Sequence, residues 1–338
     1  MEIKEAIRKI VEFKNLTENQ AFDVASEIMN GRATDAQISA FLVSLRLKGE
    51  TIDEITGFVK AMRQKAVKVF CCTDYLVDAC GTGGDKSGTF NVSTLSSFVA
   101  AGAGCRVAKH GNRSISSNCG SADLISQLGI NIELSSRKVS SCIDEIGIGF
   151  LYAPLFHRAM KYAIGPRKEI GIRTIFNILG PLTNPAGVKR QLLGVFDKRF
   201  SEPIGNVLKR LGSEHVLIVH GEDGLDEITI AGETRVTELV NGEIRNHTIR
   251  PEDFGLRKAS LEDIKGGTPE VNARIAIDIL EGEKGPRRDF VLMNAGALIY
   301  VSGKAKSIKE GIELAKESID SGEAMGKLET LKKLSNAI

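Results

Sequence analysis

The first 65 or so residues carry apolar positions at helical spacing, interrupted by short polar turns. Thr17, Thr34 and Thr51 each stand three residues before a Gln or a Glu, which is the spacing of a capping box at the start of a helix. Gly31 and Gly49 stand where the second and third of these helices are expected to end. The pattern predicts a small unit of short helices joined by tight turns.

The pattern changes after residue 67, where short apolar runs alternate with longer helical ones. The predicted strands lie at 76–77, 106–108, 192–196 and 215–219. The predicted helices lie at 91–103, 269–280 and 289–301. This alternation indicates an α/β sheet with helices packed on its faces. The segment 167–184 is rich in Gly, Pro and Asn, but it contains the apolar stretch 175–179.

The composition is that of an ordinary globular protein. The 338 residues are 42% hydrophobic and 26% charged, and the formal net charge is +2. This near-neutral charge gives no sign of the concentrated positive charge that is typical of nucleic-acid-binding proteins. No apolar run is long enough to cross a bilayer and the N-terminus lacks a signal-peptide core, so we expect a cytoplasmic protein without a membrane partner. The six cysteines show no CxxC spacing, which favours free thiols in a reducing compartment.

The sequence DACGTGGD at 78–85 is the sharpest local signal for chemistry. Its glycines follow a predicted strand and precede a predicted helix, so the backbone can approach a ligand closely and point N–H groups at it. The helix start beyond favours an anion, and the segment therefore fits a phosphate cradle. Lys86 stands where a Walker A loop or a dinucleotide-binding loop needs glycine, which disfavours both. A tight turn that binds nothing is the alternative.

Polar side chains follow at the start of the next helix and after the next strand. Asn91, Ser93 and Thr94 open the helix, where one of them would suffice as a cap. The sequence KHGNR at 109–113 gathers two cations, an imidazole and an amide after a strand, where ligands of open α/β sheets usually bind. Solvated loop charge and a structural histidine are the alternatives for this segment.

Two further polar sets complete the candidates. Ser121 and Asp123 begin a helix, and their hydroxyl and carboxyl groups fit either a cap or a phosphate-facing turn. Asp226 and Glu227 form an acidic pair in a loop after a strand. Adjacent carboxylates repel each other unless they are solvated or bridged by a cation, and Mg²⁺ prefers oxygen ligands. Solvated carboxylates remain the alternative to a metal site.

Together and in this order, these motifs resemble those of the anthranilate phosphoribosyltransferase family. The resemblance rests on DACGTGGD (78–85), NVST (91–94), KHGNR (109–113), GSAD (120–123), GIRTIFNILGPLTN (171–184) and the pair Asp226 and Glu227. It implies a magnesium-dependent enzyme of tryptophan biosynthesis that joins the amine of anthranilate to the ribose of phosphoribosyl pyrophosphate (PRPP).

The resemblance also implies an α/β fold with a small all-α N-terminal domain and a larger α/β domain that binds PRPP. The small domain would comprise residues 1–68 with roughly 165–186, and the larger one residues 69–164 and 187–338. The central sheet of the larger domain would be mostly parallel and flanked by helices. The resemblance further implies a homodimer joined through the helical domains, which is usual in the family, and hinges are expected near 67–77 and 164–189.

Roles for individual residues follow from the same resemblance. PRPP would be bound by Gly81, Thr82, Gly83, Gly84, Asp85, Thr89, Asn91, Ser93, Thr94, Lys109 and Ser121. Anthranilate would be bound by Gly81, His110, Asn112, Arg167 and Pro181, with Arg167 facing the carboxylate. Mg²⁺ would be held by Ser93, Asp226 and Glu227.

The implied reaction is a displacement at the anomeric carbon of ribose, in which the amine attacks as pyrophosphate leaves. The aromatic amine is uncharged at neutral pH, so no strong base is needed before the attack. We therefore expect no covalent intermediate and no Ser or Cys nucleophile. The closest rival enzyme is a pyrimidine nucleoside phosphorylase, which carries a different pattern around its loop. The other rival is a paralogue that binds nucleic acid, which would have lost site residues and gained a basic stripe.

Overall fold

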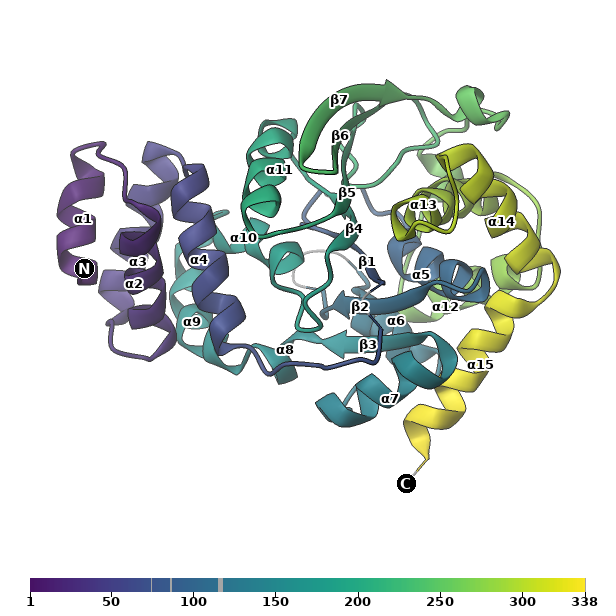
Figure 1. Ribbon diagram of the computed structural model, residues 1–338, viewed down its shortest axis with the longest axis horizontal. Coiled ribbons are helices and arrows are strands. Elements are labelled where there is room, and N and C mark those ends of the chain that lie inside the picture. Colours follow the sequence, from purple (N-terminus) through teal and green to yellow (C-terminus); the bar gives the residue numbers. More distant parts are fainter. Residues whose placement is uncertain (74, 86, 115–117, 338) are drawn as a thin grey trace.

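The computed structural model describes residues 1–73, 75–85, 87–114 and 118–337, so Lys86 lies outside the described residues. Four helices form a unit at one end of the molecule (Figure 1): α1 (Ile3–Val11), α2 (Glu18–Met29), α3 (Asp35–Lys48) and α4 (Ile52–Lys65). The capping boxes expected at Thr17, Thr34 and Thr51 are all present, with each threonine accepting from the N–H three residues on. Gly49 follows the last residue of α3 with φ 88°, a left-handed conformation that ends the helix.

A seven-stranded sheet forms the centre of the larger unit, in the order β3-β2-β1-β4-β5-β6-β7. The strands are β1 (Leu76–Gly81), β2 (Arg106–Gly111), β3 (Ile148–Tyr152), β4 (Arg190–Gly194), β5 (His215–Gly221), β6 (Thr234–Val240) and β7 (Glu243–Ile249). The pairings from β3 to β5 are parallel, and β6 and β7 add antiparallel strands at one edge. The prediction of a mostly parallel sheet with a separate helical unit is confirmed.

Helices cover both faces of this sheet (Figure 1). The remaining helices are α5 (Val92–Gly102), α6 (Ser121–Gln127), α7 (Ser136–Ile146), α8 (Ala153–Phe156), α9 (Lys161–Ile170), α10 (Phe176–Leu179), α11 (Ser201–Arg210), α12 (Pro269–Leu280), α13 (Pro286–Ser302), α14 (Ile308–Asp320) and α15 (Glu323–Asn336). The helices predicted near 91–103, 269–280 and 289–301 correspond to α5, α12 and α13. No helix in the described part of the chain is long and apolar enough to cross a membrane.

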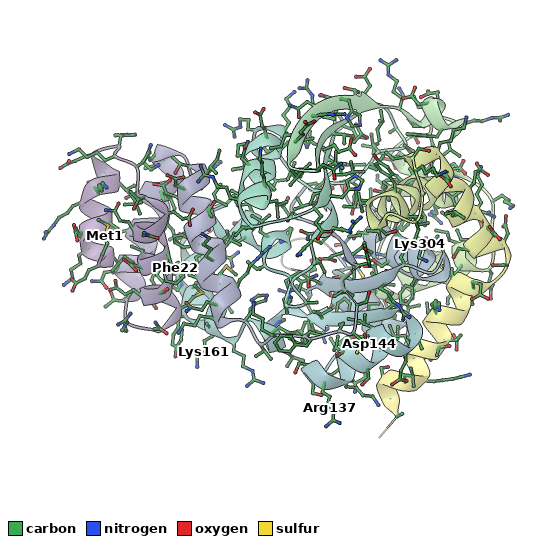
Figure 2. All side chains as sticks on the ribbon, viewed as in Figure 1. Met1, Phe22, Arg137, Asp144, Lys161 and Lys304 are labelled. Carbon is green, nitrogen blue, oxygen red and sulfur yellow. The ribbon has the colours of Figure 1, made fainter. Side chains whose placement is uncertain are left out.

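Adjacent strand residues pack on opposite sides of the sheet, which divides the core in two. Leu192 of β4 belongs to a cluster with α5 and α13, whereas Leu193 belongs to a cluster with α11 and the helical unit. Ile175 and Leu182, from the segment after α9, pack in this second cluster too. Figure 2 likewise places Lys161, the first residue of α9, on the same side of the molecule as the helical unit.

β1 and β2 extend beyond their predicted limits at their carboxyl ends. β1 continues to Gly81, so half of the 78–85 motif is strand rather than loop. β2 continues to Gly111, so Lys109 and His110 lie within the strand and not after it. β2 is longer than predicted because it pairs with β3. Lys109, His110 and Gly111 lie opposite Phe150, Leu151 and Tyr152 in this pairing. The strand predicted at 192–196 is β4, which begins and ends two residues earlier.

Candidate active site

The glycine loop leaves the carboxyl end of β1 and is tied to two neighbouring elements. The Thr82 N–H donates to the carbonyl oxygen of Gly194 in β4 at 3.0 Å. The Gly83 N–H donates to Oδ2 of Asp226 at 2.6 Å. A Cβ on Gly81 would stand 2.2 Å from the same Oδ2, so this glycine is required by the close approach of Asp226. Gly83 and Gly84 then take left-handed φ values of 68° and 79°.

An acidic cluster lies against this loop. Asp226 is buried, and this burial together with the nearby Asp85 carboxylate raises its pKa to about 7. Burial raises the pKa of Glu227 well above its usual value, and the carboxylate of the adjacent Asp226 acts in the same direction. A hydrogen bond from Ser93 partly opposes that rise. The raised pKa values show that the carboxylate forms of Asp226 and Glu227 are disfavoured in the metal-free protein, so a bound cation would be needed to stabilise both as anions.

The donor set of this cluster fits Mg²⁺. Carboxylate and hydroxyl oxygens are hard ligands, and Mg²⁺ commonly takes one or two carboxylates, with substrate phosphates and waters as its other ligands. Among the described residues, no three His, Cys, Asp or Glu side chains are grouped closely enough to hold a metal ion by themselves. Asp226 and Glu227, with Ser93, thus fit a metal that a phosphate substrate helps to bind rather than a closed protein cage.

Asp78 connects β1 with β2 and with the segment before β4. Its carboxylate accepts from the His110 N–H at 3.1 Å and from Nδ2 of Asn184 at 2.8 Å. Burial raises the pKa of Asp78, while Lys109 acts in the opposite direction. Nζ of Lys109 donates to the carbonyl oxygen of Ala79 at 2.5 Å, which holds this buried cation against β1.

The side chain of His110 lies in surroundings of low polarity. Its ring centroid is 5.2 Å from that of His157, and Nε2 of both rings is buried without a hydrogen-bond partner in the part of the chain that the structure describes. Burial and the neighbouring His157 lower the pKa of His110 well below its usual value, and burial lowers the pKa of His157 to about 4. Both imidazoles are therefore neutral at physiological pH.

The other predicted acceptor residues come from the segment between α9 and β4. Arg167, in α9, stacks over the ring of Phe176 at 5.3 Å and forms no ion pair with any described residue. Pro181 lies in the 3₁₀ turn η2 (Gly180–Thr183), where its carbonyl oxygen accepts from Gln191 at 2.9 Å. The backbone of Gly180, next to it, forms a hydrogen bond with His110.

The helix starts contribute polar groups that do not cap their own helices. Asn91 forms no side-chain cap for α5; its amide donates to the carbonyl oxygen of Cys119 and accepts from Asn272, each at 3.0 Å. Thr94 is buried, and its hydroxyl has no partner among the described residues. The Ser121 hydroxyl accepts from the N–H of Asn112 at 3.1 Å.

The structure thus gathers most of the sequence candidates at one edge of the sheet. The loop 81–85, Ser93, Lys109, His110, Asp226 and Glu227 lie at the carboxyl ends of β1, β2 and β5 or beside them. Thr89 stands beyond the loop, where it forms an isolated bridge to Lys265, and Asn112 is exposed.

Sequence reasoning missed four polar residues in this region: Asp78, His157, Asn184 and Asn272. Asp78 and Asn184 stand inside the quoted motifs, so their polar character could have marked them. No sequence pattern marked His157 or Asn272.

Comparison with known proteins identifies the family. The model of the glycosyl transferase family, a/b domain, matches residues 73–325, and the model of the helical bundle domain of this family matches residues 4–66. The anthranilate phosphoribosyltransferase of Acetivibrio thermocellus is 53% identical over 335 residues, which cover 99% of this chain and 97% of that protein. The one of Persephonella marina is 54% identical over 335 residues, or 98% of this chain and 99% of that protein.

Solved structures agree with this. The anthranilate phosphoribosyltransferase from Thermus thermophilus is 44% identical with a TM-score of 0.94, covering 98% of this chain and 99% of that chain. The enzyme from Saccharomyces cerevisiae in complex with PRPP and Mg is 31% identical with a TM-score of 0.92, covering 99% of this chain and 98% of that chain. With its glycine loop, its acidic cluster and these full-length likenesses, the chain belongs to the anthranilate phosphoribosyltransferase family.

Proposed function

We propose that this enzyme transfers the phosphoribosyl group of PRPP to the amine of anthranilate, in tryptophan biosynthesis. A bond forms between the amine nitrogen and the anomeric carbon of ribose, the bond from that carbon to pyrophosphate breaks, and the nitrogen loses a proton. The products are N-(5-phosphoribosyl)anthranilate and pyrophosphate. The observation that carries the proposal is the pairing of an acidic cluster and glycine loop with two neutral imidazoles, in a chain of this family.

The diphosphate of PRPP belongs at the acidic end. Ser93, Asp226 and Glu227 are the proposed ligands of Mg²⁺, which would neutralise the charge that develops on the leaving pyrophosphate. The N–H groups of Thr82 and Gly83 hold the loop in place by donating to Gly194 and Asp226, and the N–H groups of Gly84 and Asp85 are the proposed donors to the phosphates. Preorganised donors of this kind act without rearrangement during the reaction. The proposed PRPP residues stay as the sequence predicted them: Gly81, Thr82, Gly83, Gly84, Asp85, Thr89, Asn91, Ser93, Thr94, Lys109 and Ser121.

Anthranilate belongs at the imidazole end, with Gly81, His110, Asn112, Arg167 and Pro181 as its proposed contacts. The guanidinium of Arg167 has no carboxylate partner among the described residues, so it is available for the carboxylate of the substrate. A neutral His110 adds no charge that would compete with Arg167 for that carboxylate. The amine then needs only alignment with the anomeric carbon, which can lower a barrier by roughly 7–11 kcal/mol.

The cysteines support a direct displacement. Burial raises the pKa of Cys80, next to the loop, well above its usual value, so its thiol stays protonated and is a poor nucleophile. We expect sequential kinetics with both substrates bound before product leaves. Ping-pong kinetics would contradict this part of the proposal.

The predicted domain limits, hinges, assembly and location remain proposals. We propose the division at residues 1–68 with 165–186 against the rest, and a cytoplasmic homodimer joined through the helical unit. Val11, Phe13 and Leu47 of that unit are apolar and 56%, 73% and 75% exposed, which suits a covered face. Light scattering of the wild type and of a Phe13→Asp, Leu47→Asp variant tests the assembly; a monomeric wild type would contradict it.

The activity is tested by anthranilate fluorescence over time, with purified protein, PRPP and Mg²⁺. We expect the signal to fall only when all components are present, and pyrophosphate to appear in equal amount. Phosphorolysis of uridine and thymidine is measured beside it as the rival reaction. A flat anthranilate trace from folded protein would contradict the proposed function.

A further inference from the structure

A second set of contacts holds the glycine loop from outside the predicted site residues. The N–H of Phe196, just after β4, donates to Oγ1 of Thr82 at 3.0 Å. The guanidinium of Arg173 lies over the Phe196 ring, 4.1 Å from its centroid, and donates a hydrogen bond to the carbonyl oxygen of Gly84. The contacts therefore run from Thr82 through Phe196 and Arg173 to Gly84 and close around the loop.

The chemistry of Arg173 suits both of its contacts at once. A guanidinium is planar, so its face can stack on an aromatic ring while N–H groups at its edge donate hydrogen bonds. Gly84 has φ 79°, and a Cβ there would stand 3.4 Å from Nη2 of Arg173. The absence of a side chain at Gly84 thus leaves the arginine close to the backbone.

The hydrogen bond from Arg173 sets the direction of a peptide group. In a trans peptide the carbonyl and the following N–H point in opposite directions. Holding the Gly84 carbonyl therefore also fixes the direction of the Asp85 N–H. The N–H of Gly83 is already held by Asp226, so the peptides on both sides of the 83–84 peptide are constrained.

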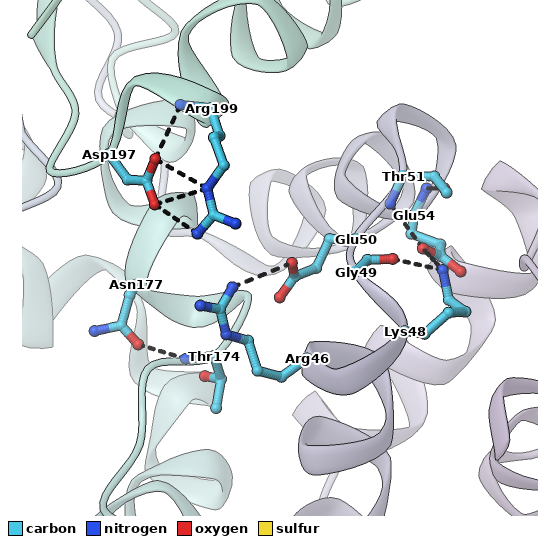
Figure 3. A network of polar contacts seen from close by, with 10 residues as sticks. All are labelled: Arg46, Lys48, Gly49, Glu50, Thr51, Glu54, Thr174, Asn177, Asp197 and Arg199. Atoms are coloured by element: carbon cyan, nitrogen blue, oxygen red, sulfur yellow. Dashed lines mark hydrogen bonds and ion pairs between the residues drawn. The ribbon is translucent and has the colours of Figure 1, made fainter. Parts of the chain in front are cut away.

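Arg173 comes from the segment that joins α9 to α10. α9 packs against α2 and α3 of the helical unit. Gly171 ends α9 with φ 63°, and the Thr174 N–H donates to Oδ1 of Asn177 at 2.9 Å, which fixes the turn on the other side of Arg173. Figure 3 shows this Thr174–Asn177 turn facing Arg46 and Glu50 at the end of α3. The arginine thus links the helical unit to the glycine loop.

We propose that Arg173 is a positioning residue for the diphosphate of PRPP. It acts by holding the Gly84 carbonyl, so that the peptide between Gly84 and Asp85 presents its N–H toward the phosphate space in the unliganded protein. The stack on Phe196 keeps the guanidinium in the orientation that this hydrogen bond needs. The inference rests on the proposed function, because it names PRPP as the ligand of the loop.

The first test compares Arg173→Ala and Arg173→Lys with the wild type. Magnesium pyrophosphate is the binding probe, because it cannot react; its dissociation constant is measured by calorimetry. Steady-state kinetics then give KM for PRPP and for anthranilate separately. We expect Arg173→Ala to weaken pyrophosphate binding and raise KM for PRPP by about tenfold, the size of one hydrogen bond to a charged group, with the anthranilate KM changed less than about threefold. Lys retains a donor but not the stack, so its effect should be intermediate.

The second test separates positioning from direct contact with phosphate. Phe196→Leu removes the stack and leaves every charge in place, so a weaker affinity for pyrophosphate in this variant is expected only if the arginine must be oriented. The double variant Arg173→Ala, Phe196→Leu should then bind pyrophosphate no more weakly than Arg173→Ala alone. Arg199→Ala is the matched control, because that arginine is 73% exposed and pairs with Asp197.

The outcomes are distinct. Unchanged pyrophosphate affinity in folded Arg173→Ala, or additive effects of the two substitutions, would overturn the inference and leave the proposed function standing. A larger effect on anthranilate than on PRPP would also overturn it, since Arg173 would then serve the acceptor. If Arg173→Ala does not fold, the affinity of Phe196→Leu for pyrophosphate decides: a weaker affinity supports the inference and an unchanged one overturns it. A wild type that neither binds magnesium pyrophosphate nor consumes PRPP would instead contradict the proposed function.

Discussion

The two ends of the candidate site are electrostatic opposites. At one end burial and neighbouring carboxylates raise the pKa values of Asp226 and Glu227, and Lys109 is the cation that acts against the rise at Glu227. At the other end the buried His110 is neutral. Arg167, which has no carboxylate partner among the described residues, is proposed to act at this end. Each end lacks a charge that a substrate can supply: Mg²⁺ with a diphosphate at the first, and a carboxylate at the second.

This difference explains how one site can distinguish two anionic substrates. Without a metal, the carboxyl groups of Asp226 and Glu227 have raised pKa values and offer an approaching anion no positive charge. An anthranilate carboxylate and a diphosphate without Mg²⁺ are both in this position. Under the proposed function, PRPP would bind together with its metal, while Arg167 would select the small carboxylate. The predictions below test whether the two ends act separately.

The largest expected effect comes from removing the charge of the acidic end. We expect Asp226→Asn with Glu227→Gln to lower kcat/KM for PRPP by about a hundredfold or more, because the metal that neutralises the leaving group is lost. The measurement is the rate at increasing Mg²⁺ and PRPP. Glu222→Gln is the control, as this exposed carboxylate in the same loop pairs with Arg235. An unchanged Mg²⁺ dependence in the double variant would remove the pair from the metal site.

The two ends should also impose opposite pH dependences on the stability of the metal-free protein. Asp226 has a raised pKa of about 7 in the folded state, so its contribution is present below the ordinary value of 3.8 and is lost as pH rises toward 7. His157 has a folded pKa of about 4, so its contribution is present above 6.5 and is lost as pH falls toward 4. Between these limits the two slopes oppose each other, each about 1.4 kcal/mol per pH unit.

Single substitutions at Asp226 and at His157 should each remove one of these contributions to the pH dependence of stability. We expect the free energy of unfolding of Asp226→Asn to rise with pH between about 4 and 6.5 relative to the wild type, and that of His157→Asn to fall. Urea unfolding across this range in metal-free buffer is the measurement. If both variants keep the wild-type pH profile, the two ends do not differ as described.

Arg167 is the sharpest probe of the imidazole end. We expect Arg167→Ala to raise KM for anthranilate by about tenfold, the value of one hydrogen bond to a charged group, with little change in KM for PRPP. The exposed neighbour Lys168→Ala is the control for charge alone. An equal rise in both KM values would contradict the assignment of Arg167 to the acceptor.

The smallest expected effect comes from a helix cap. Its removal should change the stability of the protein without changing the binding of either substrate. We expect Thr34→Ala to lower the free energy of unfolding by about 1 kcal/mol, because the capping box at the start of α3 is lost. Neither KM should change, since Thr34 is exposed on the helical unit. Ser44→Ala, in the middle of α3, is the matched control. A change in substrate affinity would show that the helical unit and the two ends are coupled more tightly than the contacts indicate.

The helical unit and the positions of β1, β2, β4 and β5 could be read from the sequence because their signals are local, whereas β3 and the order of the strands in the sheet could not. A capping box needs only Thr34 and Gln37, and both lie within one turn. The ends of β1 and β2 could not be read in this way, since Lys109 and His110 are drawn into strand by pairing with β3, which is distant in sequence. The β6–β7 hairpin was not predicted, although Asn241 and Gly242 between its strands form the two-residue turn with positive φ (52° and 77°) that an Asn-Gly sequence typically marks.

The sequence motifs predicted which residues belong to the candidate site, but they did not predict how those residues contact one another. That Gly81 admits the Asp226 carboxylate, or that His110 lies beside His157, depends on long-range packing. Arg173 stands inside the GIRTIFNILGPLTN motif, yet only its contacts with Phe196 and Gly84 give it a role. Asn272 lies 181 residues from its partner Asn91, and no local pattern points to it.

The most direct test of the separate ends is a kinetic comparison of two variants in the anthranilate fluorescence assay, each against both substrates. Asp226→Asn with Glu227→Gln should lose affinity for PRPP and response to Mg²⁺ while retaining its KM for anthranilate. Arg167→Ala should show the reverse. Equal losses for both substrates in both variants would contradict the account.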